Sequence, residues 1–354
     1  MTPRQRPLAR PGAGRNRLLL VAAGTALALA AGCSSGGDSS PAAAVGSAGT
    51  AGGGTPVTFI NNNGIPMPAS AAQTEGLFSK QGLAVQMKSL PTGTDSISGM
   101  IGGSADFVLA GDTRLIQAAS QDLPIVAVAL AQTGYPSYLA VPASDHTTKG
   151  FADLVGKKIS VEVGSSQHAG LVRYLQAIGL DPKSFQFVNI KNADSPTALA
   201  GGSVAGAVFP DPYAHASQLK GVSRLVITPQ EMVAKSGVQW PFMLITTKKY
   251  AKDHADTVQK FVNAWTCAKK DLVADPARAA TLTTAALKSY DPRVIPDLLA
   301  TTFWKQQVID PPLLADIEQQ GKALIELGTL KALPDLNGYV DNSFVNRALQ
   351  ENCS

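Results

Sequence analysis

The feature that most constrains the fold of this chain is an internal repeat at an offset of 99 positions. Residues 95–112 (DSISGMIGGSADFVLAGD) align without a gap on residues 194–211 (DSPTALAGGSVAGAVFPD), with six identities in eighteen positions. A short match in small residues can arise by chance, but the order of the expected strands and helices repeats over the same two regions. The sequence therefore predicts two related lobes.

Strands and helices are expected to alternate in both lobes. The first region predicts strands over 57–60, 83–90, 106–110 and 124–130. It predicts a helix over 68–76, a second that starts in PTGTDS (91–96) and ends at 102–103, and a third that begins in GDT (111–113) and ends at 120. The second region predicts strands over 159–163, 185–190 and 204–209, with helices over 169–178 and 195–201. After a strand over 242–247, the chain predicts helices over 255–273, 276–287, 296–307 and 313–327. Such alternation favours an α/β fold with two parallel or mixed sheets flanked by helices.

The chain is expected to cross between the lobes twice, near Pro142 and near Pro241. Lobe one would then comprise residues 56–142 plus 243–354, and lobe two residues 143–242, with the two crossings as a hinge. The C-terminal helices would pack on lobe one. A chain of 354 residues, 45% of them hydrophobic, is long enough to build both cores.

Residues 1–32 have the features of a lipoprotein signal peptide. Five arginines precede a run of fourteen uncharged residues, 18–31, which is too short to span a bilayer comfortably. The run ends in LAAGC, which resembles a lipobox, so Cys33 is the expected lipidation site; an ordinary secretory cleavage site is the alternative. Residues 33–55, rich in Ser, Gly and Ala, are expected to form a flexible tether. This places the folded part at the extracytoplasmic face of the cell membrane.

Charge and motif content exclude several classes of function. The whole chain carries 30 basic and 26 acidic residues, but without the five leader arginines the net charge is −1, which argues against nucleic-acid binding. The four histidines lack metal-ligand spacing, so neither a metal nor a cofactor is expected. Ser166 and His168 could be imagined as nucleophile and base, yet nothing in the sequence places an orienting acid beside them. The chain is therefore not expected to be an enzyme.

Two cysteines remain beyond the leader, Cys267 and Cys353. Outside the cytoplasm a pair of thiols usually oxidises, so we expect one disulfide that ties the C-terminus to the helix containing Cys267. Two free cysteines are the alternative.

The segment 157–180 (KKISVEVGSSQHAGLVRYLQAIGL) predicts a strand that enters a helix directly through small hydroxyl residues. The first backbone N–H groups of a helix lack intrahelical partners, and together with the helix dipole they attract anions. Ser165 or Ser166 could also be only a helix cap. In parallel α/β lobes, ligands bind where strands end and helices begin. That rule gives the candidate ligand-binding residues Asn61, Asn62, Thr92, Gly93, Thr94, Asp112 and Thr133 in lobe one, and Ser165, Ser166, Gln167, His168 and Asp211 in lobe two.

Residues 56–247 resemble the type 2 periplasmic binding proteins of ABC importers, in the group that includes nitrate, taurine, alkanesulfonate and thiamine-pyrimidine binders. The resemblance rests on TEGLFSKQGLAVQMKSLPTGTDS, GGSADFVLAGDTRLIQAASQDLPIVAVA, FADLVGKKISVEVGSSQHAGLVRYLQAIGLDP and AVFPDPYA. It implies two lobes that close on a small solute, which is handed to an ABC permease and its ATPase subunits. It also implies ligand contacts from the turns at 92–94 and 164–168, and a monomer as the usual state.

The candidate residues describe the solute in part. Two hydroxyl-rich helix starts favour an oxyanion such as a sulfonate, carboxylate or nitrate. Asp112 and Asp211 favour an amine or a ring N–H if they face inward, although either can be only a helix cap. Arg114 could bind an anion or face solvent. The first hypothesis is thus a lipid-anchored receptor for a taurine-like sulfonate. The alternatives are a binder or enzyme for a nitrogen heterocycle such as a thiamine-type pyrimidine precursor, and a sensory or scaffold role.

Overall fold

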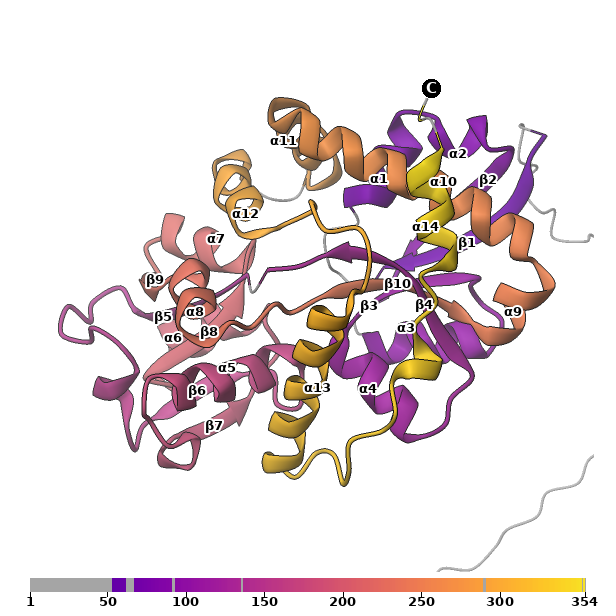
Figure 1. Ribbon diagram of the computed structural model, residues 1–354. Helices are drawn as coiled ribbons and strands as arrows, with labels where there is room; N and C mark the ends of the chain where they lie inside the picture. Colours follow the sequence, from indigo (N-terminus) through magenta and orange to yellow (C-terminus); the bar gives the residue numbers. More distant parts are fainter. Residues whose placement is uncertain are drawn as a thin grey trace, which may run out of the picture. The chain divides into compact units, whose positions relative to one another are not determined.

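The computed structural model describes residues 53–61, 67–90, 93–134, 136–288, 291–351 and 353, all within one compact unit. Their strands form two sheets flanked by helices (Figure 1). The first sheet has the order β2-β1-β3-β10-β4, with β1 (Thr55–Asn61), β2 (Leu83–Ser89), β3 (Phe107–Gly111), β4 (Ile125–Gln132) and β10 (Phe242–Thr247). The second has the order β7-β6-β8-β5-β9, with β5 (Ser137–Pro142), β6 (Lys158–Val161), β7 (Gln186–Asn189), β8 (Gly206–Pro210) and β9 (Ser223–Ile227).

The two sheets have the same topology. In the first, β1 runs parallel to β2 and β3, while β10 is antiparallel to β3 and β4. In the second, β6 runs parallel to β7 and β8, while β5 is antiparallel to β8 and β9. Adding the predicted offset of 99 to the bounds of β3 gives the bounds of β8, 206–210. The internal repeat and the two-sheet α/β fold predicted from the sequence are confirmed.

The first crossing between the sheets comes earlier than the sequence predicted. The sequence predicts residues 137–142 to belong to lobe one, but they form β5, which pairs with β8 and β9 of the second sheet. Each sheet takes its antiparallel strand from the segment that has just crossed, β5 after the first crossing and β10 after the second. The sequence gives no pairing partner for a short apolar run, so it could not assign this strand to a sheet. The return near Pro241 agrees with β10, which begins at Phe242.

Helices cover both faces of each sheet. The part of lobe one before the first crossing contains α1 (Met67–Thr74), α2 (Leu77–Lys80), α3 (Gly93–Ile101) and α4 (Asp112–Ser120). The second lobe contains α5 (Ser166–Ala177), α6 (Ser195–Ala200), α7 (Tyr213–Leu219) and α8 (Pro229–Ser236), with short 3-10 turns at Phe151–Leu154 and Pro182–Ser184. After β10 come α9 (Lys248–Asp253), α10 (Ala255–Ala274), α11 (Pro276–Ala286), α12 (Ile295–Thr301), α13 (Pro311–Glu326) and α14 (Ser343–Gln350).

One face of the first sheet packs against α10, the longest of these helices. Phe107 of β3 stacks on Phe261 of α10 with ring centroids 4.2 Å apart, and Trp265 one turn further on is fully buried. Cys267 on the same helix forms a disulfide with Cys353, with Cα atoms 5.3 Å apart. The disulfide ties the C-terminal end of the chain to the core helix of lobe one.

The other face of the first sheet is covered by a cluster that reaches into lobe two. Ile317 of α13 is buried with Ala169 and Val172 of α5, and α13 lies beside both α4 and α5 (Figure 1). Arg173 of α5 forms an ion pair with Asp316 of α13 at 2.7 Å. The sequence predicted that the C-terminal helices pack on lobe one; α13 contacts both lobes.

The helix predicted over 296–307 is wrong in its second half. Helix α12 ends at Thr301, and the backbone of Phe303 then pairs with Thr133 through two hydrogen bonds, at 2.9 and 3.0 Å. This tertiary pairing holds the segment extended against the end of β4.

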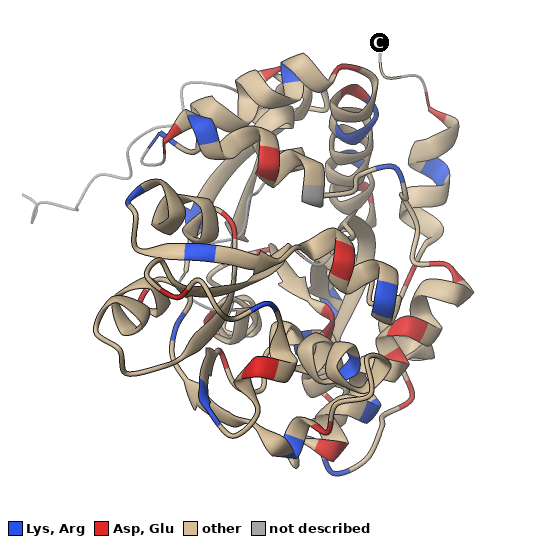
Figure 2. Cartoon of the chain, turned by 90° about the vertical axis from the view of Figure 1, so that its left-hand side faces the viewer, with Lys and Arg blue, Asp and Glu red and all other residues tan. Residues whose placement is uncertain are grey.

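In the described part of the chain no helix is long and apolar enough to cross a membrane. Basic and acidic residues are interspersed over the face that Figure 2 presents.

Candidate functional site

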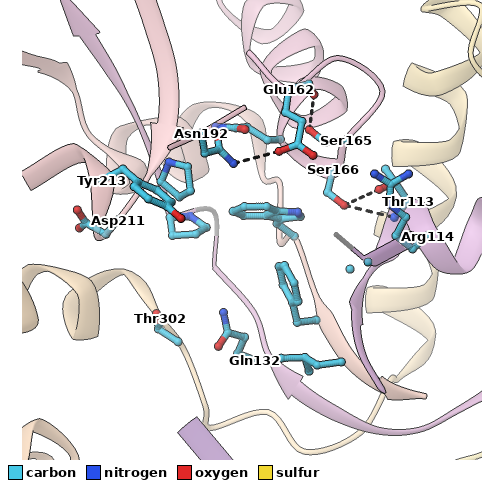
Figure 3. Close-up of a pocket in the computed structure, with 18 of the residues that line it drawn as sticks. Thr113, Arg114, Gln132, Glu162, Ser165, Ser166, Asn192, Asp211, Tyr213 and Thr302 are labelled. Atoms are coloured by element: carbon cyan, nitrogen blue, oxygen red, sulfur yellow. Dashed lines mark hydrogen bonds between the residues drawn. The ribbon is translucent and has the colours of Figure 1, made fainter. Parts of the chain in front are cut away.

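A cavity of about 240 Å³ lies between the two lobes, where strands end and helices begin. Both lobes line it. Lobe one contributes Gly111, Thr113 and Arg114 around the start of α4. Lobe two contributes Glu162 and Ser166 from the connection between β6 and α5, and Asp211 just after β8 (Figure 3). A solute in this space would therefore touch both halves of the molecule.

The N-termini of α4 and α5 meet at one end of the cavity. Thr113 Oγ1 and Ser166 Oγ lie 2.7 Å apart and form a hydrogen bond across the two lobes. Ser165 is the N-cap of α5, and its hydroxyl accepts a hydrogen bond from His168 N at 3.3 Å. The positive ends of both helix dipoles point to the same place, which favours a negatively charged ligand atom. In α4 the first two N–H groups are already bonded, Asp112 N to Pro241 O at 3.2 Å and Thr113 N to Asp112 Oδ1 at 2.6 Å.

Gly111 permits this close approach of the two helices. It is the N-cap residue of α4 and has no side chain that could cap the helix. A Cβ atom at this position would lie only 3.0 Å from Ser166 Oγ. Glycine therefore allows lobe two to come up to the backbone of lobe one without steric conflict.

Arg114 adds a full positive charge at the same end. It follows Thr113 in the first turn of α4, is half-buried and lines the cavity. Its Nη1 donates a hydrogen bond to Gln117 Oε1 at 2.7 Å, which leaves other guanidinium N–H groups for a ligand. Burial lowers the pKa of Arg114, against the opposing charges of Glu162 and Asp95, but an arginine remains protonated at neutral pH.

Asp211 lines the cavity, yet its carboxylate is already bound. His215 Nδ1 lies 2.9 Å from each carboxylate oxygen, and His215 N donates to Oδ1 at 3.1 Å. His215 Nε2 lies 3.3 Å from Asp297 Oδ2 on α12, so this histidine links lobe two to the C-terminal helices. Burial lowers the pKa of His215, but the hydrogen bond to Asp211 and the charges of Asp211 and Asp297 raise it overall. Asp211 is therefore a weaker partner for a ligand amine than its position suggests.

Aromatic side chains supply the apolar part of the cavity wall. Tyr213 begins α7, and Trp240 and Phe242 come from the second crossing, with ring centroids 5.4 Å apart. Trp240 has a φ of 43°, which is uncommon for a residue other than glycine. The crossings are tied to each other, because Gly134 N donates to Gln239 O at 2.6 Å.

The site thus combines an anion-binding end with apolar walls and further polar groups. Figure 3 shows Thr113, Arg114 and Ser166 together, with Asp211 and Tyr213 at the opposite end and Glu162 and Asn192 along the edge between them. Within the described ranges no group of three or more His, Cys, Asp or Glu side chains is arranged to hold a metal ion. This arrangement suits a small organic anion with further polar groups.

Comparison with known proteins identifies the family. Residues 66–279 match the family described as NMT1/THI5 like, which is more than half of the chain. The chain belongs to the NMT1/THI5-like family. The resemblance to periplasmic binding proteins of the sulfonate group is confirmed by the relatives that follow.

Two relatives of this NMT1/THI5-like chain are named for the solutes that they bind. It is 28% identical over 211 residues to the taurine-binding periplasmic protein of Escherichia coli K12, an alignment that covers 59% of this chain and only 64% of that protein. It is 21% identical over 280 residues to the putative aliphatic sulfonates-binding protein of Bacillus subtilis 168, covering 79% of this chain and 83% of that protein.

Solved structures share the fold. The putative periplasmic sulfonate-binding protein SsuA of Methylobacillus flagellatus KT superimposes with a TM-score of 0.70 at 20% identity, over 84% of this chain and 95% of that one. The desulfurization enzyme DszB superimposes with a TM-score of 0.63 at 14% identity, over 83% and 99% of the two chains. Because the fold is used by binding proteins and by an enzyme, the fold alone does not determine the function of this family member; the residues of its site do.

Five of the residues predicted from the sequence line the cavity. They are Gly93, Ser165, Ser166, Gln167 and Asp211. Gln167 lies at the wall, but its Nε2 donates to Ser137 Oγ at 3.0 Å and to Val208 O at 2.8 Å, which anchors α5 to the second sheet. Asn192, three residues after the end of β7, lines the cavity as well.

The other predicted residues lie elsewhere or outside the described residues. Asn61 and Thr133 are buried at the ends of β1 and β4, and Thr94 is exposed on α3. Asp112 is fully buried and is not part of the cavity lining. Asn62, Thr92 and the expected lipidation site Cys33 fall outside the residues that the structure describes.

His168 faces the interior of lobe two. Its Nδ1 accepts a hydrogen bond from Gly164 N at 3.2 Å, and its ring packs edge-on against Phe187 with centroids 4.8 Å apart. Burial lowers the pKa of His168 to about 4, so the imidazole is neutral at physiological pH. It is a packed core histidine and does not line the cavity.

Several lining residues were not among the predicted ones: Thr113, Gln132, Glu162, Tyr213, Trp240 and Phe242. Thr113 and Glu162 are each one to three residues from a predicted position, and Tyr213 lies in the DPY segment. Strand ends could have pointed to these three. Trp240 and Phe242 carry no polar signal in the sequence, because their role depends on the path of the second crossing.

Proposed function

We propose that this chain is the solute-binding component of an ABC importer and that it captures a small organic sulfonate, taurine-like in size, between its lobes. The observation that carries the proposal is the anion-binding end of the cavity, where Arg114 and the N-termini of α4 and α5 converge. Hydroxyls, a guanidinium and the positive ends of two helix dipoles together suit the three oxygens of a sulfonate. The names of the two relatives support the same chemistry.

Closure of the lobes would be the mechanism of capture. The hydrogen bond between Thr113 and Ser166 and the ion pair between Arg173 and Asp316 hold the lobes together in the conformation described. A solute that contacts both lobes binds the closed conformation better than the open one, and it shifts the equilibrium by that difference in affinity. The two crossings would act as the hinge, and X-ray scattering should report compaction when the solute is added.

We infer that the folded part is held at the extracytoplasmic face of the membrane. Lipidation at Cys33 after removal of residues 1–32, with residues 33–55 as a tether, would place a monomeric receptor within reach of the permease and its ATPase subunits. The term periplasmic in the name of the relative supports the location. Mass spectrometry of the mature protein tests the anchor, because Cys33→Ala would abolish the lipid.

We infer binding without catalysis at this site. Ser166 Oγ is bound to Thr113, and His168 Nδ1 accepts from Gly164 N, so in the described residues no hydrogen bond joins the serine to the histidine. A nucleophile needs such a base within reach. Recovery of the solute unchanged after long incubation would support this inference, and turnover would overturn it.

The experiment that tests the binding proposal is calorimetric titration with sulfonates, nitrogen heterocycles and inorganic anions. Wild-type protein should bind at least one organic sulfonate, and Arg114→Met should weaken that affinity by roughly 10- to 100-fold, because a charge-assisted hydrogen bond is lost. Arg347→Met, at an exposed arginine on α14, is the matched control and should leave the affinity unchanged. If wild-type protein binds a pyrimidine and no sulfonate, the proposal is wrong.

A further inference from the structure

The carboxylate of Glu162 lies in the cavity wall and has few hydrogen-bond partners among the described residues. It follows β6 directly, is half-buried and lines the cavity. Among the described residues its side chain accepts one hydrogen bond, from Asn192 Nδ2 at 3.3 Å. A carboxylate has about four acceptor positions, so most of its capacity is open to a ligand. Asp211, the other carboxylate of the lining, is held by His215 as described above.

Glu162 and Arg114 approach the cavity from opposite lobes (Figure 3). Among the described residues they form no direct ion pair, although each lies within the electrostatic range of the other. Lys191 is exposed at the same rim and forms no ion pair with Glu162 among these residues either. Two opposite charges therefore face one space without a direct ion pair between them among the described residues.

A ligand with charges of both signs would complete this pair. A sulfonate on Arg114 and the α4 and α5 N-termini would leave an ammonium two carbons away to approach Glu162. A sulfonate without an ammonium would instead bring its negative charge near Glu162 and would have no positive group of its own to pair with that carboxylate. Specific sites commonly use such a repulsive element against a competing ligand of similar shape.

We propose that Glu162 is a specificity-determining residue that recognises an ammonium group, so that the site selects amino-sulfonates over plain alkanesulfonates. The proposal rests on the proposed function as a sulfonate receptor. It assigns the two charges of a zwitterion to two lobes, which makes the zwitterion itself the link that closes them.

The experiment compares two ligands of equal size, 2-aminoethanesulfonate and propane-1-sulfonate, by calorimetric titration of the full chain in detergent. Wild-type protein should bind the amino-sulfonate at least tenfold more tightly. Glu162→Gln should reduce that affinity ratio by roughly 10- to 100-fold, by weakening the amino-sulfonate and strengthening the plain one. Glu318→Gln, on α13 and outside the cavity lining, makes the same change of charge and should leave the ratio as it is.

The outcomes separate this inference from the proposed function. If both sulfonates bind and Glu162→Gln leaves their ratio within twofold of wild type, the role of Glu162 is wrong while the receptor proposal stands. If wild-type protein binds propane-1-sulfonate more tightly than the amino-sulfonate, the role of Glu162 is likewise wrong while the receptor proposal stands. If wild-type protein binds neither sulfonate, both proposals fail. Glu162→Ala provides a second variant that should lower the ratio in the same direction, and thermal unfolding without ligand checks that each protein is folded.

Discussion

Replacing Asp112 with asparagine should remove a large pH dependence from the stability of the protein. Asp112 is fully buried in the first turn of α4; its Oδ1 accepts from Thr113 N at 2.6 Å, and Oδ2 has no partner among the described residues. Burial is the main cause that raises the pKa of Asp112 to about 7, with a smaller contribution from the charge of Asp316. The Ser166 hydroxyl, Thr113 N–H and Arg173 act in the opposite direction.

The magnitude follows from the two pKa values. Because the folded pKa lies above the ordinary value of 3.8, the native state holds the proton more tightly than the unfolded state. The contribution of Asp112 to the unfolding free energy is therefore at its maximum below pH 3.8 and is lost as the pH rises to about 7. The difference between the two values corresponds to about 4 kcal/mol of unfolding free energy at most. Asparagine keeps the Oδ1 acceptor and carries no charge, so it should avoid this loss.

The assay is urea unfolding of wild type, Asp112→Asn and Asp256→Asn between pH 4 and pH 8. Asp112→Asn should gain up to about 4 kcal/mol on wild type across this range, and it should be the more stable protein at pH 8. Asp256 is exposed at the start of α10, so its variant should follow the wild-type profile within about 0.5 kcal/mol. Parallel profiles for wild type and Asp112→Asn would refute the reasoning.

Two further predictions concern lobe one. Lys269 is buried with Nζ donating to Leu130 O at 2.6 Å and Gln306 O at 2.8 Å, and burial lowers its pKa to about 7. Because the unfolded state then binds more protons between pH 7 and the ordinary pKa of 10.5, wild-type stability should rise with pH above 7, whereas Lys269→Met should lack this rise in thermal unfolding at pH 6.5 and 9.5. Cys353→Ser should lower the unfolding free energy by about 4–5 kcal/mol on the chain-entropy model, since the disulfide to Cys267 closes a loop of 86 positions. Urea unfolding with reductant should bring wild type to the level of this variant, and an unchanged wild-type midpoint would contradict the assignment.

The residues of the site show how well hydrophobic periodicity and the positions of strand ends predict which residues line the cavity. Ser165 and Ser166 were predicted because a strand runs into a helix there, and both line the cavity. At the start of α4 the same rule selected Asp112, but its neighbours Thr113 and Arg114 face the ligand space. Adjacent residues in a first helical turn point in different directions, and only the packing of α4 against its neighbours fixes the rotation of the helix.

The sequence by itself determined the two α/β lobes, their repeat at 99 positions and the polar helix starts, because these depend on local periodicity and on residues close in the chain. Only the tertiary structure decided that β5 pairs with the second sheet, that α13 bridges both lobes and that Glu162 and Arg114 face one cavity. The physical reason is that the hydrophobic pattern of a segment shows which of its side chains are buried. Which side chains they contact depends on the packing of segments far apart in the sequence.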